Sequence, residues 1–263
     1  MINVPMKSSG PLNSQTVMTL NTIGIQGPKS THNITSVNSA KNDITPPVEP
    51  DHVRTSAENT SAPANIVTSS TPVAEKPIPP LSRQIQKGQK AALSENQIPP
   101  AKIYAKLGWN VTNAACDVDV SAFLLNNAGK VIGDPWFVFY GQEKSPDGST
   151  VFSHGQGTDR EIISIDFTKL NPDVTKIVFV LTIDKAFEKN LNFSMLKDAY
   201  VRIMDESDTE LVSFKMEEYY SNVTSMMIGE VYQYKGAWKF NAIGNGVAKN
   251  LAGLCELYGV EVV

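Results

Sequence analysis

The sequence predicts a mainly β protein: a two-sheet β-sandwich with a C-terminal helix, preceded by a disordered N-terminal tail. Three observations support this prediction. Every aromatic residue lies from Tyr104 onward. In that part of the chain, short runs of β-branched and aromatic residues alternate with turn residues, as strands do. Near the C-terminus, apolar residues recur at the spacing of a helix, at Val247, Leu251, Leu254 and Tyr258.

Residues 1–78 are predicted to be a disordered tail, and residues 79–263 a single folded domain. The first 80 residues contain no aromatic side chain and hold 11 of the 16 prolines, with many Ser, Thr and Asn. Such a segment cannot bury enough apolar surface to offset the conformational entropy of its chain. Its five basic and five acidic residues balance, so the net charge of -4 belongs to the folded domain.

Short strands separated by turns favour a sandwich over a parallel α/β sheet. The segment 176–183 contains Ile-Val-Phe-Val-Leu, which suits a strand buried on both faces. Lys235-Gly236 lies between two strand-like runs and predicts a hairpin. The predicted strands cover 103–109, 118–125, 136–140, 162–167, 176–183, 199–204, 210–216, 226–234 and 237–243.

Two helices are predicted. One covers 187–197. The other begins after Gly246 and runs to about Tyr258, with Gly259 placed just past its end, where a left-handed residue often terminates a helix.

Composition argues against several partners. The mildly acidic domain has no cluster of Lys and Arg of the kind that duplex nucleic acid requires, so we expect no nucleic-acid partner. The longest apolar stretches, such as 177–181, are too short to cross a bilayer, so we expect no integral membrane segment. Residues 1–10 lack a basic region followed by an apolar core, so we expect a cytoplasmic location.

Residues for catalysis are scarce, and we expect the protein not to be an enzyme. His154, beside Ser153, is the one histidine of the predicted domain and forms no recognisable triad. Cys116 and Cys255 are far apart, match no zinc spacing and suggest buried thiols in a reducing cytosol. A disulfide or a reactive thiol is the alternative for these two cysteines.

Acidic residues at strand ends form the most informative pattern. On a strand, Asp117, Asp119 and Ser121 share one face. Two carboxylates on one face repel each other unless a cation lies between them, and calcium takes six to eight oxygen ligands. A solvated acidic face is the alternative.

Further acids lie in three other loops or strand ends. If these segments meet at one end of the sandwich, they build a calcium site between loops. Asp147 has an alternative role, since it lies in the turn-forming sequence Ser-Pro-Asp-Gly-Ser. The predicted metal ligands are Asp117, Asp119, Asp147, Asp159, Glu161 and Asp184.

A series of short motifs extends over nearly all of residues 81–263. They are Leu107-Gly108-Trp109-Asn110, the run 117–125 (DVDVSAFLL), Phe137-Val138-Phe139-Tyr140, the run 144–149 (KSPDGS), Lys176-Ile177-Val178-Phe179-Val180, Asn192-Phe193, Gly229-Glu230-Val231-Tyr232, Trp238-Lys239-Phe240 and the run 242–246 (AIGNG). In these motifs and in their order, the folded part resembles the TerD family of tellurium-resistance and general stress proteins.

The resemblance implies a β-sandwich that binds Ca²⁺ through acidic loop residues. Asp117 and Asp119 match the family's paired aspartates, and Asp159 and Glu161 match its acidic loop. Two positions depart from the pattern, because Arg160 and Lys185 stand where the family has acids. In the segment 182–186, Asp184 lies one place before the position of the family's aspartate. Fewer carboxylates predict weaker calcium binding, particularly for a second ion.

The resemblance also implies a function: a calcium-binding stress-response domain, associated with tellurite resistance, that acts as a non-catalytic binding or scaffold module. Its partners would be calcium and other Ter-type stress proteins. One alternative is a protein that binds a small ligand such as a cyclic nucleotide, with Arg160 and Lys185 contributing to a phosphate site. Another is a metal-free interaction module, because those two cations replace acids. An enzyme acting on tellurium oxyanions would need a reactive arrangement of Cys116 and Cys255.

Overall fold

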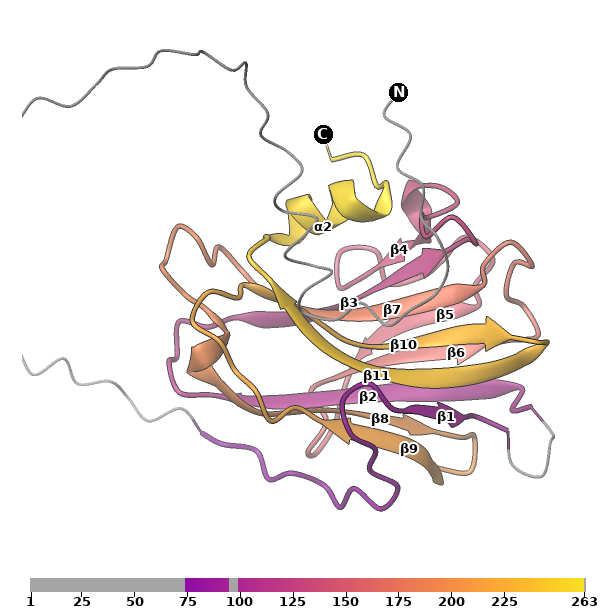
Figure 1. Ribbon diagram of the computed structural model, residues 1–263, viewed down its shortest axis with the longest axis horizontal. Coiled ribbons are helices and arrows are strands. Elements are labelled where there is room, and N and C mark those ends of the chain that lie inside the picture. The colour runs from indigo at the N-terminus through magenta and orange to yellow at the C-terminus, as the bar shows by residue number, and fades with distance from the viewer. Residues whose placement is uncertain (1–73, 95–98, 263) are drawn as a thin grey trace, which may run out of the picture.

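The strands form two antiparallel sheets that pack face to face, in this computed structural model (Figure 1). The structure describes residues 74–94 and 99–262. The predicted two-sheet β-sandwich with a C-terminal helix is therefore confirmed. Most of the predicted disordered tail, residues 1–73, lies outside the described residues.

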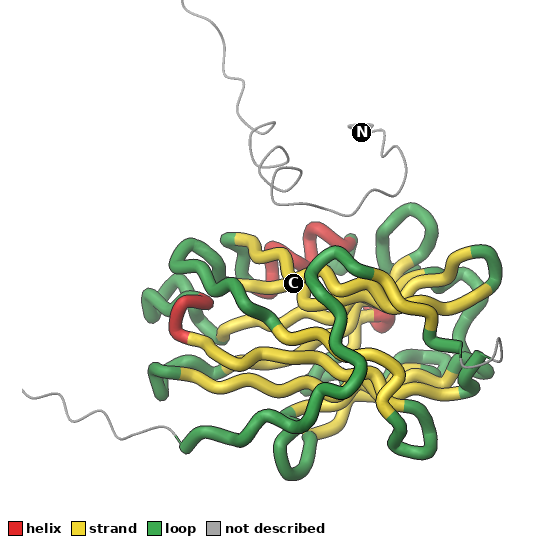
Figure 2. The backbone as a smooth tube through the Cα atoms, turned by 60° about the horizontal axis from the view of Figure 1, so that its bottom comes forward, coloured by secondary structure: helices red, strands yellow, loops and turns green. Residues whose placement is uncertain are grey.

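The two sheets have six and five strands. In spatial order the first contains β1 (Lys90–Ala92), β11 (Ala237–Val247), β10 (Ser225–Tyr234), β7 (Lys176–Ile183), β3 (Val118–Leu125) and β4 (Phe137–Val138). The second contains β5 (Thr150–His154), β6 (Glu161–Asp166), β2 (Lys102–Val111), β8 (Leu196–Met204) and β9 (Glu210–Lys215). Figure 2 shows these strands stacked in layers, with loops at both ends.

The main core lies between the sheets and follows the two-residue period of the strands. On β3 the inward residues are Val118, Val120, Ala122 and Leu124. The opposite sheet presents side chains such as Ile163 to the same core.

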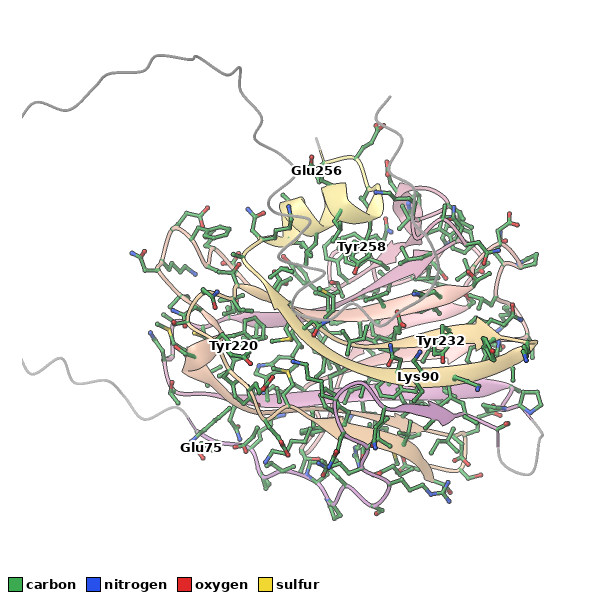
Figure 3. All side chains as sticks on the ribbon, in the orientation of Figure 1. Glu75, Lys90, Tyr220, Tyr232, Glu256 and Tyr258 are labelled. Atoms are coloured by element: carbon green, nitrogen blue, oxygen red, sulfur yellow. The ribbon has the colours of Figure 1, made fainter. Side chains whose placement is uncertain are left out.

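A second apolar cluster lies on the outer face of the six-stranded sheet, where helix α2 (Leu251–Tyr258) covers it. The rings of Phe123 of β3 and Tyr258 of α2 pack in a tilted arrangement, with their centroids 4.5 Å apart. Figure 3 shows Tyr258 between the helix and the sheet. Because α2 covers its second face, β7 is buried along almost its whole length, as its unbroken apolar sequence predicted.

Several local predictions hold. Strands β3 and β7 have their predicted bounds. The turn between β10 and β11 has positive φ at both Lys235 (51°) and Gly236 (78°), which fits the twist of a two-residue hairpin. Gly259 ends α2 in the left-handed conformation, with φ 83°.

The predicted helix over 187–197 is wrong. Positive φ angles at Lys185 (49°) and Asn190 (52°) turn the chain after β7 and prevent a continuous helix. Only a short 3-10 helix, η2 (Phe193–Met195), forms there, and β8 begins directly after it. Leu191, Phe193 and Leu196 are all buried in the core between the sheets.

Other boundaries also differ from prediction. Strand β11 continues to Val247, so α2 begins later than predicted, at Leu251, with the Asn250 side chain accepting a hydrogen bond from the Gly253 N–H. The 3-10 helix η1 (Asp134–Trp136) replaces the start of the strand predicted over 136–140. Strands β1 and β5 were not predicted.

Contacts of the domain begin before the predicted boundary between 78 and 79. The Lys76 N–H donates to Asn110 Oδ1, and Asn110 Nδ2 donates to the Lys76 carbonyl, both at 2.9 Å. Glu75 pairs with Lys197 of β8, and Figure 3 labels Glu75 near the point where the described chain begins. Residues 75 and 76 are therefore held against β2 and β8.

Gly108 is required by a close approach between β2 and β8. It lies opposite Tyr200 in the register, and a Cβ at position 108 would overlap the buried Tyr200 ring. Gly108→Ala is expected to lower the free energy of unfolding by about 1–3 kcal/mol, the usual range for overpacking a core. Urea denaturation measures this change. Gly133→Ala is the control, since a Cβ there meets nothing closer than 3.5 Å; an equal loss in both variants would contradict the explanation.

Candidate functional site

Four of the six predicted metal ligands come together at one end of the sandwich. The register pairs Val118 of β3 with Ile183 of β7, and just beyond this pair the Asp184 N–H donates to the Asp117 carbonyl at 2.8 Å. Asp117 and Asp184 are therefore adjacent, and Asp119 is the second residue of β3. Glu161 approaches from β6 of the other sheet.

Glu161 is held in place by the open edge of β3. Strand β4 pairs only with Ala122 and Phe123, so the part of β3 before them lacks a neighbour on that side. Glu161 Oε2 accepts a hydrogen bond from the Val120 N–H at 2.6 Å, and the side chain is 6% exposed. A buried backbone N–H needs such a partner, so the carboxylate satisfies the strand edge while it faces the other acids.

The electrostatics of the cluster favour a cation. Burial, reinforced by repulsion from Asp117 and Asp184, raises the pKa of Asp119 to about 6. Burial also raises the pKa of Glu161 to about 7; the Val120 N–H opposes the rise, while Asp119 and Asp117 add to it. Both carboxyl groups would regain their charge more readily if a positive charge lay between them.

Basic side chains lie at the margin of the cluster, and the charge of Arg160 lowers the pKa of Glu161 against the effect of burial. His154, the residue opposite Glu161 in the β5–β6 register, lowers the pKa of Asp119 slightly against the effect of burial. Lys189 Nζ lies 3.3 Å from Asp184 Oδ2, but both side chains are about two-fifths exposed, so this ion pair is weak.

The donor set suits calcium in its chemistry, because it consists of carboxylates at the meeting point of strand ends. Across residues 74–94 and 99–262, however, no three His, Cys, Asp or Glu side chains already converge as a finished metal centre does. Binding would therefore require the exposed side chains of Asp117 and Asp184 to change rotamer and turn toward Asp119 and Glu161.

Asp159, a predicted ligand, is occupied by an ion pair instead. It is 4% exposed, and Arg202 of β8 binds it through two donors, Nε at 3.1 Å and Nη2 at 2.6 Å. The Tyr200 hydroxyl donates to the same carboxylate at 3.0 Å. With three donors on its oxygens, Asp159 fixes the loop before β6, and through this loop the start of that strand, where Glu161 lies.

Asp147 lies away from the cluster. Its carboxylate accepts hydrogen bonds from the Ser145 hydroxyl and from the N–H groups of Ser149 and Asn171. Burial alone would raise its pKa, but these hydrogen bonds lower it below the usual range. Since Thr150 begins β5 and His154 ends it beside Glu161, Asp147 is at the opposite end of that strand. The turn-organising role suggested by the sequence matches these contacts.

The two cations that replace family acids behave differently. Arg160 is held by the protein: its Nε donates to the Trp109 carbonyl at 2.5 Å, and its guanidinium carbon lies 5.6 Å from the Trp109 ring centroid. Lys185 lies on the loop after β7 and lines a cavity beside Asp119. The Arg160 side chain contacts Trp109, and Arg160 is not among the residues that line the cavity beside Lys185.

Sequence reasoning missed the groups that hold the acids in place. Arg202 and Tyr200 are separated from Asp159 by some forty residues, and nothing in the spacing links them. His154 was considered only as a nucleophile, although its place opposite Glu161 follows from a strand that was not predicted. Cys116 and Cys255 are free and buried, as predicted, and burial raises the pKa of both thiols.

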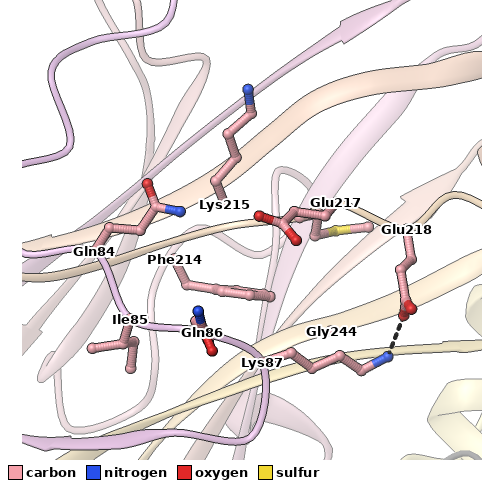
Figure 4. A pocket seen from close by; sticks show the side chains of 10 residues that line it. Gln84, Ile85, Gln86, Lys87, Phe214, Lys215, Glu217, Glu218 and Gly244 are labelled. Carbon is pink, nitrogen blue, oxygen red and sulfur yellow. Dashed lines mark hydrogen bonds and ion pairs between the residues drawn. The ribbon is translucent and has the colours of Figure 1, made fainter.

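Two cavities accompany the site. One, of about 220 Å³, is next to Asp119 on the outer face of the six-stranded sheet. The other, of about 270 Å³, lies between the segment 84–87 and the end of β9. Figure 4 shows this second cavity, with the Lys87–Glu218 ion pair of 2.9 Å at its rim. Its lining mixes opposite charges that neutralise one another, and the four clustered carboxylates are not among its residues.

A family model for the TerD domain matches residues 81–258, which include both sheets, α2 and the acidic cluster. The chain belongs to the TerD family. The match covers the folded part of this TerD protein and leaves out the segment before residue 81.

Named relatives agree with this assignment. The tellurium resistance protein TerD of Alcaligenes sp. is 36% identical over 191 residues, covering 69% of this chain and 99% of the relative. General stress protein 16U of Bacillus subtilis is 34% identical over 189 residues, covering 68% and 97%. The solved structure of SAV2460, titled as a protein of unknown function, superposes with a TM-score of 0.50 at 16% identity, over 63% of this chain and 100% of that chain. This last similarity concerns the fold alone. No helix in the described part of the TerD chain is long and apolar enough to cross a membrane.

The Arg202–Asp159 pair is expected to stabilise the domain. Arg202→Gln leaves a buried carboxylate without its charged partner and should lower the free energy of unfolding by about 3 kcal/mol. Urea denaturation tests this change. Lys169→Gln is the control, because Lys169 pairs with Asp166 at 60% exposure and its loss should matter little. Additive losses in an Asp159→Asn, Arg202→Gln double variant would show that the pair does not interact as described.

The acidic cluster should make the metal-free protein less stable as pH rises. The raised pKa values of Asp119 and Glu161 mean that the folded state holds protons which the unfolded state releases at lower pH. The stabilising contribution of these two protonated groups to the free energy of unfolding is complete below about pH 4, where both carboxyl groups are protonated in the folded and the unfolded state. It is lost as pH rises through about 6 and about 7. Denaturation at a series of pH values, in chelator, measures the slope. Asp119→Asn should flatten it; an unchanged slope would contradict the raised pKa of that residue.

Proposed function

We propose that this TerD protein is a calcium-binding, non-catalytic module of the stress response. The observation that supports this most strongly is the group of four carboxylates, Asp117, Asp119, Glu161 and Asp184. They come from three separate segments, and two of them have pKa values raised by burial and mutual repulsion. Such an arrangement stores unfavourable charge that one divalent cation would relieve.

The proposed ligands divide into a fixed part and a movable part. Glu161 and Asp119 lie on strands, and the hydrogen bond from Val120 fixes Glu161. Asp117 precedes β3, and Asp184 begins the loop that follows β7. A bound calcium ion supplies positive charge that neutralises these carboxylates. The loop residues would then turn inward, and Asp184 would exchange its weak pair with Lys189 for a ligand position.

Ordering of this loop is the proposed output. The segment after β7 carries exposed side chains, including Phe187, which is 51% exposed. Fixing the segment would present a defined surface to another protein, as metal binding does in other switches. Other Ter-type proteins in the cytoplasm are the proposed partners. The tellurium resistance protein TerA of Alcaligenes sp., which is 36% identical over 125 residues, is a relative of this kind.

Calcium titration of the full chain tests the proposal. Calorimetry should show saturable binding, and the melting temperature should rise, because a ligand at a hundred times its Kd stabilises the folded state by about 2.7 kcal/mol. An Asp117→Asn, Asp119→Asn double variant should lose both effects.

A matched control keeps the same change of charge away from the cluster. Asp173 and Glu206 are exposed and have no role in the proposed site. The Asp173→Asn, Glu206→Gln variant should bind calcium as the natural chain does. Absence of calcium binding in the natural chain, or equal binding in both double variants, would sink the proposal.

A further inference from the structure

The cavity beside Asp119 has two chemically different ends. It lies on the outer face of the six-stranded sheet, between the loop after β7 and the first turn of α2. Along β3 the outward residues are Asp119, then Ser121, then Phe123, whose ring packs against that of Tyr258 of α2. The cavity therefore runs from an acidic end toward the start of the helix. Its polar lining includes Asp119, Ser121, Thr182, Asp184, Lys185 and Glu188.

An unpartnered hydroxyl belongs to one of the residues that line this cavity. Ser121 is 2% exposed, and its Oγ has no hydrogen-bond partner among the described residues. Leaving a buried hydroxyl unpaired is unfavourable, and native proteins rarely do so without a reason such as a bound molecule. As a donor, this hydroxyl suits an oxygen acceptor on a ligand.

The start of α2 adds further donors. The Asn250 side chain accepts a hydrogen bond from the Gly253 N–H at 3.0 Å. The N–H groups of Leu251 and Ala252 lie in the first turn, where the helix offers them no carbonyl acceptor. Both residues line the cavity. A helix N-terminus carries partial positive charge and suits an anion. The Lys185 side chain, which also lines the cavity, brings a full positive charge.

The acidic end explains why such an anion would need help to bind. Asp119, Asp184 and Glu188 lie on the same lining and would repel it. A cation held by Asp119 and Asp184 would reverse that repulsion, because a bound metal ion becomes the largest local charge.

We propose that this cavity binds a small oxyanion, a carboxylate or phosphate group, and that calcium bound at the acidic end raises its affinity. The donors would be the Ser121 hydroxyl, the first N–H groups of α2 and the Lys185 ammonium. The inference rests on the proposed calcium site and names a second ligand for it. The chain would then respond to calcium and a small anionic molecule together.

The first experiment titrates inorganic phosphate, and separately acetate, into the full chain by calorimetry. Each titration is done in chelator and again with saturating calcium, at concentrations where calcium phosphate stays dissolved. At least one of the two oxyanions should bind in the presence of calcium. Its affinity should be at least about tenfold lower in chelator, because a modest coupling free energy between two sites changes affinity by such a factor. Whichever probe binds identifies the group as phosphate or carboxylate.

Variants then separate the cavity from the calcium site. Ser121→Ala removes an unpartnered hydroxyl, so the domain should fold and bind calcium normally while oxyanion affinity falls about tenfold, as for loss of one hydrogen bond to a charged group. The matched control is Ser153→Ala on exposed β5. Lys185→Gln should also lower the affinity for the oxyanion. Its matched control is Lys235→Gln, at the β10–β11 hairpin.

Each other outcome is decisive. Normal calcium binding with no bound oxyanion would overturn this inference and leave the proposed function standing. Oxyanion binding that survives both Ser121→Ala and Lys185→Gln would mean that the anion binds elsewhere. Equal oxyanion affinity in chelator and in calcium would overturn the linkage, and a chain that binds no calcium would overturn the proposed function with it.

Discussion

The hydrogen bond from the Val120 N–H to Glu161 joins the two sheets at the point where the acidic side chains meet. It exists because β4 is too short to cover the beginning of β3. An open strand edge needs an acceptor, and the start of β6 supplies a carboxylate. The same side chain thereby satisfies the edge and stands beside Asp119. Without Glu161 the candidate site would consist of Asp117, Asp119 and Asp184 at the end of one sheet.

The contrast between Asp159 and Asp119 shows how surroundings decide the role of a buried acid. Asp159 has Arg202 and Tyr200 as partners, so its charge is compensated within the fold. Asp119 has acids as its nearest charged neighbours, and its pKa rises. Compensated acids stabilise the structure, whereas uncompensated ones are available to a ligand. In this TerD protein the first kind holds the loop on which Glu161, one of the second kind, depends.

Helix α2 has a comparable double role. Its apolar side covers Phe123 and the outer face of β7, which allows that strand to be buried on both faces. Residues of its first turn line a cavity next to the acidic cluster, and the first N–H groups of a helix have no partner within the helix. Asp119 and Asp184 belong both to the cavity lining and to the acidic cluster. A change of charge in the cluster therefore alters the electrostatic potential in the cavity.

The sequence by itself determined the fold class, the bounds of β3 and β7, the hairpin at Lys235-Gly236 and the end of α2 at Gly259. Each depends on local alternation or on a residue whose backbone freedom is read directly from its type. It also placed Asp117, Asp119, Glu161 and Asp184 in a common candidate site by resemblance. Tertiary structure alone decided that Asp159 is neutralised by Arg202 and that Ser121 lies in a cavity. Those outcomes depend on which strands become neighbours across the sandwich, and contacts between residues far apart in the chain leave no periodic trace in the sequence.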